Sequence, residues 1–79
     1  MVTEEDIEKG IYRIETENAC DTNNDTMSFF IENHLPDDMD IEFRDENYIE
    51  FLCNNRLYSA VAVGDGDFTH HRIEFEFIH

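Results

Sequence analysis

The sequence predicts an α+β fold in which one or two N-terminal helices pack on a four-stranded antiparallel β-meander. Apolar residues recur at helical spacing before residue 36, and they alternate with polar residues after residue 40. Short turn-like segments separate the alternating runs. The chain has 79 residues, of which 41% are hydrophobic, and it shows no linker or internal repeat. We therefore expect one small domain over residues 1–79.

Residues 3–18 carry the pattern of a first helix. Thr3 can cap it, and Ile7, Ile11 and Ile14 recur at the spacing of one helical face. Gly10 weakens a continuous helix by about 1 kcal/mol. A short helix followed by a strand at residues 11–16 is therefore the alternative.

Residues 26–35 predict a second, shorter helix, because Pro36 disfavours helical geometry at the residue before it. The apolar spacing predicts which side chains point inward. They are Met27, Phe30, Ile31 and Leu35.

Four alternating runs after residue 40 predict the strands, and short connections make sequential neighbours antiparallel. Turns are expected at residues 45–47, at Asn54-Asn55, where asparagine tolerates positive φ, and at residues 64–67. The predicted core-facing residues of the four strands are Ile41 and Phe43, then Ile49, Phe51 and Cys53, then Leu57, Ser59, Val61 and Val63, and last Ile73, Phe75 and Phe77.

The charge balance is the strongest functional signal, because 20 acidic residues face five basic ones and the formal net charge is −15. Solubility of a small domain is usually secured by a net charge of about 2–8 in magnitude. The excess repels nucleic acid and attracts basic proteins. Adaptation to high salt is the alternative explanation of the same acidity.

Acidic and aromatic side chains are predicted to share the solvent-facing side of the sheet, because they alternate with the predicted core residues. We expect this side to bind a partner, together with the turn after the first strand. The predicted partner-binding residues are Glu42, Tyr48, Glu50, Tyr58, Glu74 and Glu76 on the strands, with Asp45 and Glu46 in the turn.

These features predict a stoichiometric inhibitor that imitates the charge lattice of DNA or RNA and occupies the basic cleft of a nucleic-acid-binding effector. A phage-type anti-CRISPR or other anti-defence protein is the first expectation, with a CRISPR effector or a restriction or repair enzyme as partner. An immunity protein for a basic nuclease toxin, or a calcium-binding or salt-adapted acidic protein, is the alternative. We expect no enzyme activity, no cofactor and no direct binding to nucleic acid or membrane.

One weak metal pattern is present: four residues match ligand positions of an EF-hand calcium loop, although Thr26 stands where glycine is needed. These residues are Asp21, Asn23, Asp25 and Glu32. His70 and His71 are adjacent, so on a strand they point to opposite faces and cannot share one ion.

Cys20 and Cys53 have no metal-ligand spacing. No signal-peptide pattern or apolar run of membrane length is present either. A cytoplasmic protein with reduced thiols is therefore expected, in the host cell if the chain is phage-encoded, and a disulfide between the two cysteines is the alternative.

Overall fold

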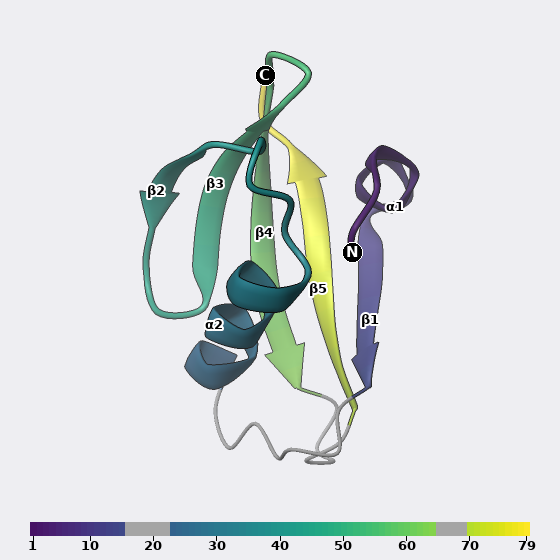
Figure 1. Cartoon of the computed structure of the whole chain (residues 1–79), viewed down its shortest axis with the longest axis vertical. Helices are drawn as coiled ribbons and strands as arrows, with labels where there is room; N and C mark the ends of the chain where they lie inside the picture. Colours follow the sequence, from purple (N-terminus) through teal and green to yellow (C-terminus); the bar gives the residue numbers. More distant parts are fainter. Residues whose placement is uncertain (16–22, 65–69) are drawn as a thin grey trace.

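The computed structural model describes residues 1–15, 23–64 and 70–79, which form two helices and one five-stranded antiparallel sheet. The α+β class is confirmed, but the predicted count of four strands was one short. The strand order across the sheet is β1-β5-β4-β3-β2 (Figure 1). In chain order the elements are α1 (Glu4–Lys9), β1 (Ile11–Glu15), α2 (Asn23–Asn33), β2 (Ile41–Arg44), β3 (Tyr48–Cys53), β4 (Arg56–Gly64) and β5 (His70–Phe77).

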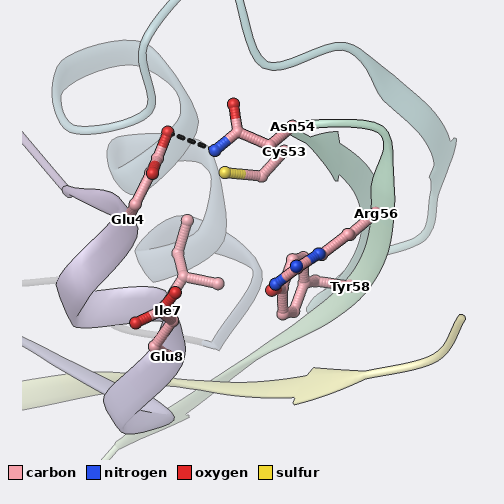
Figure 2. Close-up of a pocket in the computed structure, with 7 residues that line it drawn as sticks. All are labelled: Glu4, Ile7, Glu8, Cys53, Asn54, Arg56 and Tyr58. Atoms are coloured by element: carbon pink, nitrogen blue, oxygen red, sulfur yellow. Dashed lines mark hydrogen bonds between the residues drawn. The ribbon is translucent and has the colours of Figure 1, made fainter.

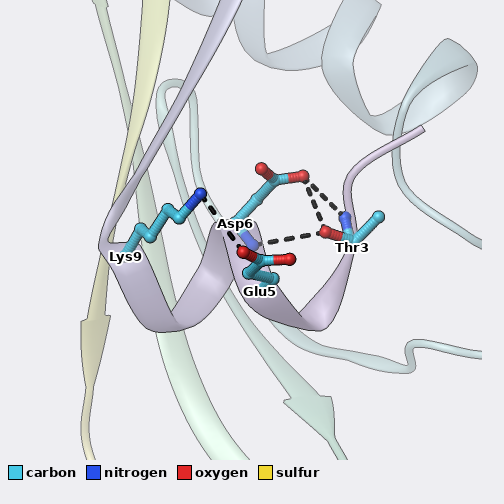
Figure 3. A network of polar contacts seen from close by, with 4 residues as sticks. All are labelled: Thr3, Glu5, Asp6 and Lys9. Carbon is cyan, nitrogen blue, oxygen red and sulfur yellow. Dashed lines mark hydrogen bonds and ion pairs between the residues drawn. The ribbon is translucent and has the colours of Figure 1, made fainter.

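The N-terminal segment follows the helix-then-strand alternative. The backbone N–H of Asp6 donates to Thr3 Oγ1 at 3.3 Å, and the Asp6 carboxylate accepts from the Thr3 backbone N–H at 3.0 Å (Figure 3). This capping box starts α1. Gly10 ends the helix after six residues with φ of 86°, a left-handed conformation that glycine adopts without steric cost. The chain then continues as β1, which pairs antiparallel with β5.

The strands β2 to β5 form the predicted meander. Asn54 and Asn55 connect β3 to β4 with φ values of 52° and 62°, as a two-residue hairpin loop requires. This loop pairs Cys53 with Arg56, and it thereby sets the register of the whole β3–β4 pair. The predicted turn at residues 64–67 lies outside the described residues after Gly64.

The core lies between the helices and one face of the sheet, here called the inner face. The helix α2 crosses in front of β4 in Figure 1 and buries Met27 and Phe30 completely. Leu35 is also buried and Ile31 is partly buried, as predicted. The inner-face strand residues in the core are Ile14, Ile49, Phe51, Cys53, Tyr58, Ala60, Ala62, Ile73 and Phe75.

Two histidines form hydrogen bonds that connect the α2 region to the strands: the buried His71 on β5 and the half-buried His34 directly after α2. Thr26 Oγ1 and His71 Nδ1 form a hydrogen bond of 3.1 Å, and both residues are buried. The Tyr12 hydroxyl and His34 Nδ1 form another of 2.8 Å. The His34 carbonyl also accepts from the Val2 backbone N–H at 2.8 Å. The N-terminus is therefore fastened to the end of α2.

The sheet corrects three predictions about which strand residues face the core. In β4 the residues that face the core are Tyr58, Ala60 and Ala62. Leu57, Val61 and Val63 lie half-buried on the other side, together with the buried Ser59. In β2 a bulge between Ile41 and Phe43 breaks their common face, and both stay exposed, at 37% and 50%. Phe77 was also predicted inward and is 58% exposed.

Candidate interaction surface

The candidate site is the face of the sheet opposite the helices, here called the outer face. Cross-strand partners in an antiparallel sheet point to the same side, so the register defines this face. One row across the sheet holds Glu50, Ser59 and Glu76, and the next row holds Tyr48, Val61, Glu74 and Ile11. The remaining members are Phe43, Leu52, Leu57, Val63, Arg72 and Arg13.

Three of the predicted carboxylates do meet on this surface. Glu50 lies on β3 and Glu76 on β5, and Ser59 of β4 is the cross-strand partner of both. Two strand spacings therefore separate these two backbones, or about 9.6 Å. Glu74 lies two residues from Glu76 along β5, at about 6.6 Å. Glu74 and Glu76 are exposed and Glu50 is half-buried.

A hydrogen-bond chain fixes the β3 side of the face. The Tyr48 hydroxyl donates to Glu50 Oε2 at 2.6 Å. The pKa of Tyr48 lies above its ordinary value, first because of this hydrogen bond, then because of burial and the negative charge of Glu50. A hydrogen bond with Ser59 acts in the opposite direction. The phenol stays a neutral donor, so it holds the Glu50 carboxylate in one orientation. Phe43 packs edge-on against the Tyr48 ring at 6.1 Å.

Tyr58 was predicted on the outer face, and that placement was wrong. Its ring is 7% exposed and stacks on Phe51 at 6.0 Å on the inner face. The two-residue loop explains this, because pairing Cys53 with Arg56 puts Phe51 opposite Tyr58. Tyr58 cannot contact a partner on the outer face.

The other predicted residues lie around the β2–β3 hairpin. Glu42 is exposed at the β2 bulge, between residues that pair on opposite faces, so it is not part of the carboxylate rows. Asp45 and Glu46 form the exposed turn after β2, where the Asp45 backbone N–H donates to the Tyr48 carbonyl at 2.8 Å. Asp45 also accepts from the Glu46 backbone N–H at 2.8 Å. These three acids are at the edge of the sheet beside the outer face.

Sequence reasoning missed a row of apolar side chains on the outer face. Leu57, Val61 and Val63 alternate along β4, the central strand, with the buried Ser59 among them. A shallow hollow of about 360 Å³ opens beside this row. It is lined by Gly10, Ser59, Val61, Glu74, Phe75 and Glu76. The loop at Asn54-Asn55 is the sequence signal that locates this row, because a two-residue loop fixes the facing of every β4 residue.

The acids are at the surface throughout the described chain. Of the 20 acidic residues, 15 have a described exposure, and none of these 15 is buried. Among the bases, Lys9 pairs with Glu5 at 3.4 Å and Arg72 with Glu74 at 3.7 Å. Arg72 lies opposite Arg13 in the β1–β5 register, so the outer face has a basic corner beyond its carboxylates.

The described part of the calcium pattern, from Asn23 onward, does not form a loop. The helix α2 begins at Asn23, so Asn23, Asp25 and Glu32 lie on one continuous helix, whereas EF-hand ligands need a turning loop. Asp21 lies outside the described residues, as does Cys20. Within residues 1–15, 23–64 and 70–79, no group of three or more His, Cys, Asp or Glu side chains is arranged to hold a metal ion.

A small pocket lies between α1 and the β3–β4 hairpin (Figure 2). The amide of Asn54 donates to Glu4 Oε1 across its mouth at 2.6 Å. Burial raises the pKa of the Cys53 thiol there, and the nearby charges of Glu4, Asp38 and Glu8 raise it further. A thiol with a raised pKa stays protonated and is a poor nucleophile or metal ligand. This pocket therefore offers no reactive cysteine.

Comparison of the chain with protein-family models, curated proteins and solved structures gives no match. In the described part of the chain, neither helix has the length and apolar character needed to cross a membrane.

Proposed function

We propose that the protein is a stoichiometric inhibitor that presents carboxylates where a nucleic acid would present phosphates, and so occupies the basic cleft of a nucleic-acid-binding effector. The observation that carries this proposal is the placement of Glu50, Glu74 and Glu76 on one open sheet face of a chain with a net charge of −15. A cleft that binds nucleic acid gains affinity by neutralising phosphates with Lys and Arg, and the same side chains can neutralise these carboxylates.

The class of target follows from the charge. CRISPR effectors hold nucleic acid in positively charged channels, and restriction and repair enzymes and nucleases also need basic clefts. Within this class, an anti-CRISPR or other anti-defence role of a phage protein is the proposed function.

The test is a displacement assay with labelled duplex DNA and guide-loaded complexes. A panel of purified CRISPR effectors, restriction and repair enzymes, and basic nuclease toxins would be titrated with the protein at increasing salt. We expect release of nucleic acid from at least one member, with weaker inhibition at higher salt because exposed charges are screened over about 8–10 Å.

Two charge variants make the test specific to the outer face. Glu50→Lys with Glu76→Lys reverses two outer-face carboxylates, and Glu32→Lys with Asp37→Lys reverses two exposed acids elsewhere. Each pair changes the net charge by the same four units, from −15 to −11. The first pair should weaken inhibition at least tenfold, which corresponds to about 1.4 kcal/mol, and the second should weaken it far less. Equal inhibition by the two folded variants, or no displacement from any of the three classes, would refute the proposal.

A further inference from the structure

Both sides of β4 carry apolar residues. On the inner side, Ala60 and Ala62 are completely buried and small, which gives α2 room to lie close to the sheet. On the outer side, the larger Leu57, Val61 and Val63 remain half-exposed. Both helices of the described chain pack on the inner face, so no helix covers this outer row.

The outer row lies between two acidic borders. Glu50 borders it on β3, and Glu74 and Glu76 border it on β5. The borders are about 9.6 Å apart, which matches the diameter of about 10 Å of an α-helix with its side chains. From Leu57 to Val63 the row is about 20 Å long, the length of about 13 helical residues.

From this geometry we propose that the outer face receives one amphipathic α-helix of the target, lying along β4. Its contacting side would carry apolar residues over Leu57 and Val61, flanked by Arg or Lys at the two acidic borders. This inference rests on the proposed function and makes its partner more specific. The major groove of B-DNA, about 12 Å wide, likewise admits an α-helix between two lines of negative charge. The target is then a protein that reads duplex through a recognition helix.

Charge and aromatic contacts favour this occupant over a second copy of the chain. Two copies face to face would bring together two surfaces that each carry Glu50, Glu74 and Glu76, with a net charge of −15 on each chain. A basic helix instead meets opposite charge at Glu50 and Glu76, whereas Glu74 already pairs with Arg72 at 3.7 Å. On the β3 side, the rings of Phe43 and Tyr48 lie next to Glu50, where an arginine can bind the carboxylate and stack on a ring.

The test uses two synthetic helical peptides of about 14 residues with identical Leu and Arg content. In the patterned peptide the leucines form one stripe flanked by arginines, and in the scrambled peptide they are spread around the helix. Binding to the full chain is measured by fluorescence anisotropy at about 0.15 M and about 0.5 M salt. We expect the patterned peptide to bind at least tenfold more tightly, and this advantage to persist at the higher salt, because apolar contacts are not screened.

A pair of variants locates the binding. Val61→Ser removes an apolar side chain from the centre of the row, and it should reduce the advantage of the patterned peptide at least threefold. Ile41→Ser, the matched control, removes an exposed apolar side chain from the edge strand and should leave the advantage unchanged.

Equal affinity for the two peptides in the unmodified protein would overturn the helix inference and leave the displacement test of the proposed function untouched. A patterned-peptide advantage that Val61→Ser does not reduce would also overturn it, because the helix would then bind elsewhere. A selective, Val61-dependent peptide complex with no displacement from any nucleic-acid-binding enzyme would support the helix site and refute the proposed function.

Discussion

The facing of β4 can be tested with two substitutions at neighbouring positions. Ala60 is completely buried beneath α2, between its cross-strand partners Ile49 and Phe75. Replacing it by Leu adds three carbon atoms at a completely buried position, and such overpacking costs about 1–3 kcal/mol. Val61 points away from the core and is half-exposed. Replacing it by Leu adds one carbon atom at the surface, which should change the stability by less than about 0.5 kcal/mol.

Urea unfolding followed by circular dichroism measures both effects. A chain of this length has a total stability of about 4–12 kcal/mol. With a urea dependence of about 1 kcal/mol per M, the midpoint should fall by about 1–3 M for Ala60→Leu and hardly at all for Val61→Leu. The opposite order, with Val61→Leu the more destabilising change, would show that β4 faces the other way and would remove the outer apolar row.

Three further outcomes are expected. Phe51→Ala should lower the free energy of unfolding in urea by about 3–5 kcal/mol, because its ring is completely buried against Tyr58 and Phe75. Phe77→Ala, at an exposed ring, should lower it by less than about 1 kcal/mol, and equal losses would contradict this core. Burial, and then the nearby N-terminal amine, lower the pKa of His34 from its ordinary value, so folding favours the neutral ring; its contribution to stability is present above about pH 6.5 and is lost as the pH falls further. His34→Gln should therefore reduce the drop in melting temperature between about pH 7.5 and about pH 5, and an unchanged drop would contradict this role. Calcium should raise the melting temperature no more than magnesium at equal ionic strength, and a calcium-selective rise that Asp25→Ala abolishes would restore a calcium site.

The first helix shows how one apolar spacing fits two structures. Ile7 and Ile14 are both buried, as the helical spacing predicts, but Ile7 lies on α1 and Ile14 on β1. Ile11, which should share their face in a helix, is instead half-exposed on the outer face. The capping residues could be read directly from the sequence. The end of the helix depends on the positive φ of Gly10. The strand β1 that follows is formed by pairing with β5, about 60 residues away in the sequence, which a local pattern does not show.

The β3–β4 hairpin was predicted with a correct turn and an incorrect face. With Cys53 on the inner face, a loop limited to Asn54 and Asn55 pairs Cys53 with Arg56, and Tyr58 then has to point inward. The prediction followed the alternation of apolar residues instead, and it placed Leu57 and Val61 in the core. That criterion fails for β4 because apolar residues occur on both of its sides, as in strands that are covered on both faces. Turn length is the more reliable signal in such a strand.

The acidic borders also explain how an apolar row on an open sheet face can remain accessible. Exposed apolar strands tend to associate, and charged side chains placed next to them oppose this. On the outer face, Glu50, Glu74 and Glu76 flank Val61, so a second copy that covers the row brings a second set of carboxylates to the same surface. A basic partner removes this repulsion at the same time as it covers Val61. The same three carboxylates therefore oppose self-association and favour a basic helix, so neutralising them should both promote dimers and weaken binding of the target.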